Sequence, residues 1–349
     1  MLARPKANKY IVLSGNSHKE LARLVCSHLD SREGDCKLFY KSNLETHVII
    51  NDSVRGCNVF IIQTGSQDVN RDIMEACILS YGCKSSSCET VTLVMPYLAY
   101  SRHCRRNGRS AIECQLVARM FAQSGVDKLL TVDLFADEIQ GFFEIPVENL
   151  RASAPMIRHI KLNFRNLANS VVVALDARSA HRASYFAAEL DLPMAIIHCR
   201  NRILEVSPDA ELTKSDGSVV ASQSTRQYHL VGEVKEKDVI VVSNMVDDSE
   251  RITEVAKLLH RKAAKTIVAI ATHGLLCDQK MQEIQASHIN QLILTNSIPL
   301  QELESKYSKL CVLDLSPLLA EAIRRIHNQE SMYGLFSDTD FAKTEEDDD

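Results

Sequence analysis

The chain has 349 residues, of which 45% are hydrophobic and 24% charged, and its formal net charge is −5. This length favours roughly two domains of ~150 residues, each with a core of its own. The negative charge does not favour nonspecific nucleic-acid binding, and no apolar run of 18 residues predicts a membrane span. The eleven cysteines form no CxxC pair and no apolar signal segment is visible, so a reducing, cytoplasmic location is predicted.

Strand and helix patterns alternate along the whole chain. In the first half, strands are predicted at 10–13, 36–39, 47–51, 59–63, 90–96 and 128–132, and helices at 19–29, 68–81 and 112–124. In the second half, strands are predicted at 171–174, 194–198, 239–242, 266–272, 291–295 and 311–314, and helices at 180–190, 249–260 and 317–327. This alternation is typical of an α/β fold, and its recurrence predicts two similar doubly wound domains with mainly parallel sheets.

The domain boundaries follow from the same alternation. We predict an N-terminal domain at 1–150, a C-terminal domain at 151–336 and an acidic, solvated tail at 337–349. The stretch 203–228 is rich in Ser, Asp, Thr and Gly, which predicts a mobile surface insertion in the C-terminal domain.

One predicted loop holds candidate ligand-binding residues. The segment 243–248 follows the strand at 239–242 and precedes the helix at 249–260, which places it at the carboxyl edge of a sheet, where phosphate and sugar ligands bind. Asp247, Asp248 and Ser249 offer oxygen atoms there. Two interpretations stay open, because the same residue types also cap and start helices without binding any ligand.

Motifs spread over the chain resemble those of the ribose-phosphate pyrophosphokinases, or phosphoribosyl pyrophosphate synthetases. They are NDSVRG at 51–56, IQGFF at 139–143, ATHG at 271–274, TN and IP within 295–299, and EAIRRIHN at 321–328. The resemblance extends over about 10–336. It implies two phosphoribosyltransferase-like domains, Mg²⁺-dependent transfer of the ATP diphosphoryl group to ribose 5-phosphate, and assembly into dimers and hexamers.

Several positions depart from what the resemblance implies for catalysis. Phe135 stands where the family has a His that contacts the ATP phosphates and the metal, and a phenyl ring does neither. Ser243 and Asn244 stand where the family has the paired acids of its ribose-phosphate loop, and Glu250 and Arg251 replace the small residues that cradle the 5′-phosphate. We therefore predict no catalytic residue and no metal ligand.

Other positions that the resemblance assigns to ligands are retained. The residual nucleotide-binding set comprises Asn43, Glu45, Arg102 and His103. The degenerate ribose-phosphate set comprises Asp176, Asp247, Asp248 and Ser249, and an effector phosphate is assigned to Ser53, Arg55 and Ser331 between subunits. Alternatives stay open for two of them. Arg102 also suits a solvated basic loop at a subunit interface, and Asp176 also suits the cap of a strand end.

These losses, together with the insertion, resemble the phosphoribosyl pyrophosphate synthetase-associated proteins more than the synthetases, although Phe135 departs from both. We predict a pseudoenzyme, a non-catalytic regulatory subunit that joins catalytic synthetase subunits in a dimer-based, hexamer-like homo- or hetero-oligomer and modulates phosphoribosyl pyrophosphate and nucleotide biosynthesis. No cofactor is required in this interpretation, while residual binding of ATP, ADP, phosphate or Mg²⁺ stays open. The alternatives are an active ribose-phosphate diphosphokinase and a stand-alone nucleotide or phosphate sensor.

The best-preserved motifs hold packing residues rather than catalytic ones. The resemblance implies that surfaces near 51–56 and 139–143 bring subunits together, and a like-for-like interface lets a homologue replace one subunit. The alternative is that Phe142 and Phe143 fill the core of the chain itself. On the interface interpretation, Val54→Asp is expected to release the chain from its partner and leave its fold intact.

Overall fold

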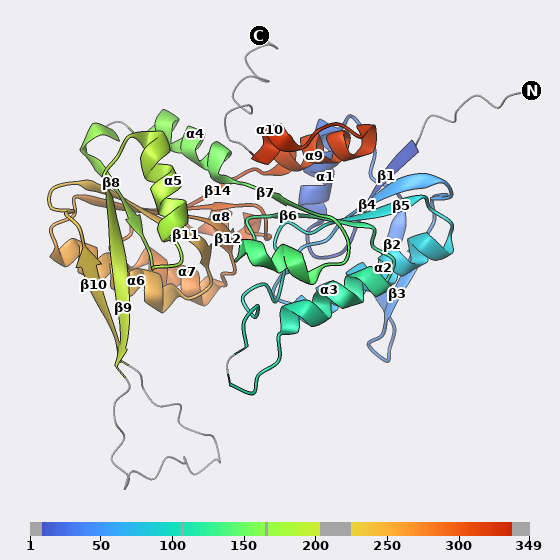
Figure 1. The fold of residues 1–349 in the computed structure, drawn as a ribbon, viewed down its shortest axis with the longest axis horizontal. Helices are drawn as coiled ribbons and strands as arrows, with labels where there is room; N and C mark the ends of the chain where they lie inside the picture. The colour runs from blue at the N-terminus through green and yellow to red at the C-terminus, as the bar shows by residue number, and fades with distance from the viewer. Residues whose placement is uncertain (1–8, 107, 165–166, 203–224, 337–349) are drawn as a thin grey trace, which may run out of the picture.

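The computed structural model describes residues 9–106, 108–164, 167–202 and 225–336. It contains two sheets, each with helices on both faces, and a small two-stranded ribbon (Figure 1). The predicted tail at 337–349 and most of the predicted insertion, 203–224, lie outside the described residues. Within the described ranges, no helix has both the length and the apolar character that crossing a bilayer requires.

The first half forms a five-stranded sheet in which every neighbouring pair is parallel, in the order β1-β4-β5-β6-β7. Its strands are β1 (Lys9–Ser14), β4 (Cys57–Ile62), β5 (Thr90–Val94), β6 (Lys128–Val132) and β7 (Val147–Leu150). Its helices are α1 (Lys19–His28), α2 (Val69–Ser85), α3 (Glu113–Gln123) and the 3-10 helix η1 (Asp137–Phe142). The antiparallel ribbon consists of β2 (Cys36–Tyr40) and β3 (Thr46–Ile50).

The second half forms a seven-stranded sheet in the order β10-β9-β8-β11-β12-β13-β14, with β10 antiparallel to β9 and the other pairs parallel. Its strands are β8 (Ser170–Ala174), β9 (Met194–Arg202), β10 (Thr225–Val231), β11 (Asp238–Val246), β12 (Thr266–Gly274), β13 (Gln291–Thr295) and β14 (Leu310–Leu313). Its helices are α4 (Ser153–Asn163), η2 (Leu167–Asn169), α5 (Ala180–Leu190), α6 (Ser249–Arg261), α7 (Asp278–Gln285), α8 (Gln301–Lys306), α9 (Ser316–Asn328) and α10 (Tyr333–Phe336).

Alternation along the strands divides the core into layers. In β8, Val171 and Val173 face the side covered by α6, α7 and α8, whereas Val172 and Ala174 face the side covered by α4 and α5. The second of these layers is continuous with the core of the first half, because α9 packs against α1 (Figure 1). One buried layer thus joins the two sheets and fixes how their edges face each other.

The structure confirms the doubly wound α/β class and mainly parallel sheets. The strands and helices predicted from periodicity are all present, with ends shifted by a few residues. The domain boundary near 150 stays a prediction. The strands of the two sheets fall on either side of it, while α9 crosses back from the second half to pack on the first.

Three expectations were wrong in detail. The strand β11 continues to Val246, because it stays paired with β12 as far as Gly274, so the segment 243–246 is strand rather than loop. The antiparallel strand β10 starts at Thr225, inside the stretch predicted as insertion up to 228. The short elements β7, α4, α7, α8 and α10 were not predicted, since brief segments with mixed polarity give little periodic signal.

Candidate functional site

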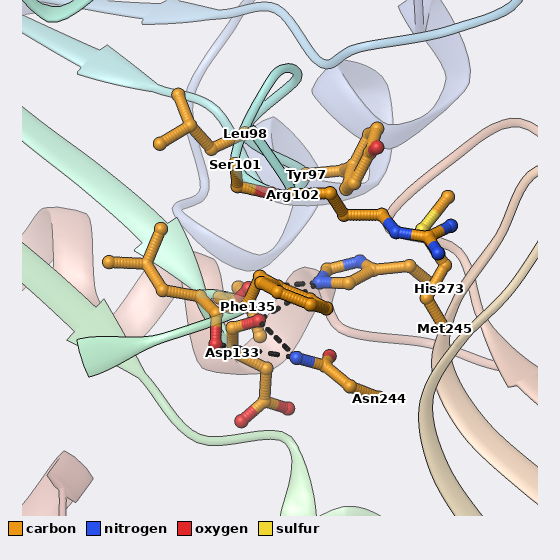
Figure 2. Close-up of a pocket in the computed structure, with 11 residues that line it drawn as sticks. Tyr97, Leu98, Ser101, Arg102, Asp133, Phe135, Asn244, Met245 and His273 are labelled. Carbon is orange, nitrogen blue, oxygen red and sulfur yellow. Dashed lines mark hydrogen bonds between the residues drawn. The ribbon is translucent and has the colours of Figure 1, made fainter. Parts of the chain in front are cut away.

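The candidate site is a narrow cleft where the carboxyl edges of the two sheets meet. It lies beyond the ends of β5 and β6 on one side and at the ends of β11 and β12 on the other, and it is lined by Tyr97, Leu98, Ser101, Arg102, Val132, Asp133, Leu134, Phe135, Asn244, Met245 and His273 (Figure 2). Its empty volume is about 250 Å³, open solvent included. The lining side chains lie close together, so the cleft has little room for a nucleotide.

Asp133 is the buried acid at the base of this cleft. Its side chain is 1% exposed, and its Oδ2 lies 2.9 Å from the guanidinium of Arg182 and accepts hydrogen bonds from the hydroxyl of Thr272 (2.7 Å) and the amide of Ala152 (3.1 Å). Burial alone raises the pKa of this carboxyl, but Arg182, Thr272 and the nearby His273 outweigh it and hold the pKa below its usual range. Asp133 is therefore a structural ion, already neutralised by its own chain.

Asn244 stands where the resemblance places one of the paired acids, and its side-chain amide donates hydrogen bonds. Its Nδ2 donates to the carbonyl oxygens of Asp133 and Leu134, both at 3.3 Å, as the dashed lines in Figure 2 show. A carboxylate at this position has no hydrogen to donate and would face two carbonyl oxygens. The substitution thus holds the strand end of β6 against β11 and leaves no acid to bind a ribose hydroxyl or a metal.

His273 links the same strand ends. Its Nε2 lies 3.1 Å from the carbonyl oxygen of Val132 and 3.3 Å from that of Asp133, and its Nδ1 lies 2.9 Å from the hydroxyl of Ser297. Burial lowers the pKa of His273 to about 4, although the neighbouring Asp133 opposes this shift. The ring is therefore neutral at physiological pH and serves as a hydrogen-bonded crosslink between the sheets.

Phe135 lies close to two cationic side chains. The guanidinium carbon of Arg102 is 5.9 Å from the centre of its ring and that of Arg178 is 5.4 Å away. Figure 2 shows Arg102 and Asn244 on opposite sides of this half-buried ring. Contacts of this kind between a cation and an aromatic face are worth roughly 0.5–1 kcal/mol at exposed sites. The phenyl ring thus occupies space beside the guanidinium groups of Arg102 and Arg178, where a phosphate would otherwise be attracted.

Two further arginines of the region pair with aspartates. Arg102 forms an ion pair with Asp247, and Arg251 lies 2.5 Å from Oδ2 of Asp176. Burial raises the pKa of Asp176, but the hydrogen bonds from Arg251 and Ser179 outweigh it, so the pKa is lowered. Arg182, Arg102 and Arg251 are thus each paired with an aspartate of the same chain.

The remaining residues of the predicted ribose-phosphate loop support the helix start. Asp248 caps α6, since its Oδ1 accepts a hydrogen bond from the amide of Arg251 (3.3 Å), and the hydroxyl of Ser249 donates to Glu283 (2.5 Å). The side chain of Asp176 accepts from the amide and hydroxyl of Ser179 at 2.7 and 2.8 Å and so closes the turn that leads into α5. Their roles as ligand residues stay predictions.

The other predicted sites lie away from the cleft lining. Asn43 and Glu45 belong to the exposed turn of the β2–β3 ribbon, where Asn43 accepts from the amide of Glu45 (3.2 Å). His103 is exposed and lies 3.3 Å from Glu113. The predicted effector residues Ser53, Arg55 and Ser331 are all exposed, which leaves them accessible to a ligand without showing one.

The roles of three residues that organise the cleft were missed from the sequence. Arg182 sits inside α5, where the pattern only predicts a helix, and its partner Asp133 is far away in sequence. Thr272 and His273 belong to the ATHG motif, whose preservation signalled importance without saying that it holds the two sheets together. Nothing in the local periodicity marks such long-range polar contacts.

The expectation for Val54 was wrong. Its side chain is 1% exposed and packs in the core of the first half beside Ala76 and Leu79. Ile139 and Phe143 are also buried in this core, so the alternative that the 139–143 motif fills the core is the one observed for these two residues. A charge at Val54 would disrupt the fold itself rather than test an interface.

The family's magnesium ion can be tested against the same residues. Phe135 offers no ligand atom, Ser243 and Asn244 carry no charge, and the carboxylate of Asp133 is held by Arg182. Among the described residues, no three His, Cys, Asp or Glu side chains converge in a way that would hold a metal ion. The residues present in the cleft do not fit the ion.

The fold and the cleft define a protein of the phosphoribosyltransferase-like class with two such domains. Residues 10–125 match the N-terminal domain of ribose phosphate pyrophosphokinase, and residues 166–337 match the phosphoribosyl synthetase-associated domain. The chain therefore belongs to the family of the ribose-phosphate pyrophosphokinases and the phosphoribosyl pyrophosphate synthase-associated proteins.

Individual relatives carry both kinds of name. The chain is 37% identical to human phosphoribosyl pyrophosphate synthase-associated protein 2, over 93% of each chain, and 37% identical to ribose-phosphate pyrophosphokinase 2 of Schizosaccharomyces pombe, over 95% of this chain and 98% of that one. The crystal structure of phosphoribosylpyrophosphate synthetase from Mycobacterium smegmatis superposes with a TM-score of 0.82 at 30% identity, covering 92% of this chain and 100% of that one. Equal identity to both kinds leaves the chemistry of the cleft to decide between them.

Proposed function

We propose that this chain is a non-catalytic subunit that associates with phosphoribosyl pyrophosphate synthetase subunits and modulates phosphoribosyl pyrophosphate supply and nucleotide biosynthesis. One observation carries the proposal. Arg102, Arg182 and Arg251 already bind the chain's own aspartates, and the ring centre of Phe135 is 5.9 Å from the guanidinium carbon of Arg102 and 5.4 Å from that of Arg178.

Diphosphoryl transfer depends on cations that are free to neutralise the charge building up on the transferred group. At and around this cleft the carboxylates of Asp133, Asp176 and Asp247 bind the cations instead. An incoming ATP that recruited these cations would have to break the pairs, and the buried carboxylate of Asp133 would lose its nearer cation, which is unfavourable. The lack of metal-binding groups at Phe135, Ser243 and Asn244 likewise supports a function that requires no cofactor.

The names of the relatives support the association. Several relatives at 35–37% identity are called synthase-associated proteins, over more than nine tenths of this chain.

The surface offers a candidate contact region as well. Met74 and Tyr81 on α2 and Leu116 on the neighbouring α3 are large apolar side chains that are 46%, 66% and 60% exposed. The 139–143 segment adjoins α3, because η1 contacts α3, and Val54 of the 51–56 segment belongs to the same hydrophobic core as the buried faces of α2 and α3.

The catalytic part of the proposal is tested by assaying the purified chain with ATP, Mg²⁺ and ribose 5-phosphate, beside an active synthetase as positive control. We expect turnover far below the ~10 s⁻¹ of a median enzyme. Because several interactions are missing at once, Phe135→His alone is not expected to restore activity. Turnover above roughly 1 s⁻¹ in the wild-type chain would contradict the proposal.

The association is tested by co-expression with a synthetase of the same cell, followed by size-exclusion chromatography with light scattering. We expect a joint species that Tyr81→Glu weakens, because a charge replaces an exposed apolar contact. The matched control is Leu162→Glu on α4, which changes a 75% exposed side chain of the other half. Separate elution of the wild-type chain and the synthetase would refute the association.

A further inference from the structure

A second hollow lies at the opposite edge of the seven-stranded sheet from the cleft. It is formed where α6 ends, β12 begins and the segments preceding β13 and β14 approach, with an empty volume of about 580 Å³, open solvent included. The polar side chains lining it are His260, Lys265, Ser287, His288, Asn290 and Lys309, which together we call the basic hollow. No aspartate or glutamate is among its lining residues.

Both lysines of the basic hollow lack a carboxylate partner in the part of the chain that the structure describes. Lysines that do pair there are Lys84, Lys257 and Lys306. Lys309 is half-buried and donates to the carbonyl oxygen of Ser287 (2.9 Å), and burial lowers its pKa. A partly desolvated cation without a counter-charge is unfavourable, and a bound anion removes this cost.

Two histidines add donors beside these lysines. The rings of His260 and His288 are stacked with their centres 4.0 Å apart and their planes 7° from parallel. They come from different elements, the last turn of α6 and the segment before β13. Because neither is paired with an acid in the hollow, their ring nitrogens remain suited to an oxyanion, which accepts hydrogen bonds from imidazole and ammonium groups alike.

A purely structural role explains part of this cluster. Basic side chains at the end of a helix interact favourably with its carbonyl groups, which accounts for His260 and Arg261 at the end of α6. It does not account for His288 and Lys309, which lie on other segments and converge on the same hollow. The carboxylate nearest in the strand register, on Asp238, accepts from the hydroxyl of Thr266 and does not line the hollow.

We propose that the basic hollow binds a small molecule through a phosphate or diphosphate group, at a site separate from the cleft and from the predicted effector residues. Lys265 and Lys309 supply the charge, and the rings of His260 and His288 and the side-chain NH2 of Asn290, whose oxygen accepts from the amide of Ile267, supply directed hydrogen bonds. The site uses residues of the C-terminal sheet alone, so it does not depend on assembly with another subunit.

The proposal is tested by isothermal titration of the full chain with inorganic phosphate and with diphosphate at low ionic strength. We expect Lys309→Met and His288→Asn each to weaken binding roughly tenfold, as loss of a charge-assisted hydrogen bond does. Lys257→Met is the matched control, an exposed lysine on α6 that pairs with Glu254 outside the hollow. It is expected to leave binding unchanged.

Further variants separate this site from others. Arg55→Ala and Arg102→Ala remove the predicted effector arginine and the cleft arginine, and binding in the hollow is expected to survive both. Circular dichroism checks that each variant folds. If Lys309→Met does not fold, His288→Asn still tests the site, because His288 is exposed. Absence of binding in the wild type, or binding that His288→Asn and Lys309→Met leave intact, overturns the proposal.

Discussion

The two edges of the seven-stranded sheet hold basic side chains in opposite states. At the carboxyl edge, Arg182 pairs with the buried Asp133, Arg102 with Asp247 and Arg251 with Asp176. At the amino edge, Lys265 and Lys309 line a hollow that has no acid among its residues. At the edge where the fold ordinarily binds ligands these three arginines are thus paired with acids, whereas the two lysines at the opposite edge are not paired with an acid among the described residues.

The difference shows what the paired groups do at the cleft. Asp133 is 1% exposed and the side chain of Arg182 is 14% exposed, so each must have its partner to remain charged. The pair has become part of the core that joins the sheets, as have Asn244 and His273. Substitutions in the cleft are therefore expected to lower the stability of the fold strongly, whereas substitutions in the exposed basic hollow are expected to change it little.

The sharpest way to break this comparison is Arg182→Met. The substitution keeps most of the side-chain volume but removes the nearer cation of the buried Asp133, whose other cation, Arg151, is 3.9 Å from Oδ1. Removing one partner of a buried pair typically costs about 3–5 kcal/mol, so we expect a loss of this size in the free energy of unfolding, measured by urea denaturation.

Two controls show whether charge pairing is the cause. Arg178→Met changes an exposed arginine near the same cleft that contacts Phe135, and it is expected to change stability by less than about 1 kcal/mol. Adding Asp133→Asn to Arg182→Met removes the unpaired charge and is expected to recover part of the loss. If the double variant were as unstable as the sum of both single variants, pairing would not explain the effect.

A pH titration sharpens the comparison further, because the cleft also holds a buried neutral histidine. The pKa of His273 is about 4 in the folded chain, against 6.5 for an ordinary histidine. As the pH falls from 6.5 to 4, the unfolded chain binds a proton here that the folded chain does not. Stability is therefore full above pH 6.5 and falls by about 3 kcal/mol across this window.

The buried His18 has a pKa of about 4 for the same reason, burial, and contributes in the same direction. His273→Asn isolates one of the two contributions. The variant is expected to be less stable at every pH, since it loses hydrogen bonds, but its unfolding free energy should fall less steeply between pH 6.5 and 4. An unchanged slope would show that His273 is not the neutral group that the structure indicates.

The sequence predicts the features that depend on residues close together in the chain, and it predicts them better than contacts between distant residues. Val171 to Ala174 and Leu292 to Leu294 are apolar runs that predict buried strands directly, and the sheets follow from them. The loss of ligand groups at Phe135 and Asn244 is also visible in the sequence, once the family motifs have set the register.

What could not be predicted are contacts between residues far apart in the chain. Arg182 and Asp133 are in different halves, and Lys309 meets His260 only after the strands have aligned. The burial of a single residue between polar neighbours could not be predicted from the sequence either. Val54 lies between Ser53 and Arg55, which are exposed, yet its side chain is in the core.

The smallest expected effect belongs to the amino edge. Lys309→Met removes a half-buried ammonium group whose pKa burial has lowered and which has no carboxylate partner within the described ranges. In the absence of phosphate, stability should stay the same or rise by up to about 1 kcal/mol, because the apolar side chain carries no desolvation cost. Added phosphate should raise the thermal midpoint of the wild type more than that of the variant, since a ligand stabilises the state that binds it. Differential scanning fluorimetry with and without phosphate measures both effects. A loss of stability near that of Arg182→Met would show that Lys309 is a structural ion like those of the cleft, and the contrast between the two edges would be lost.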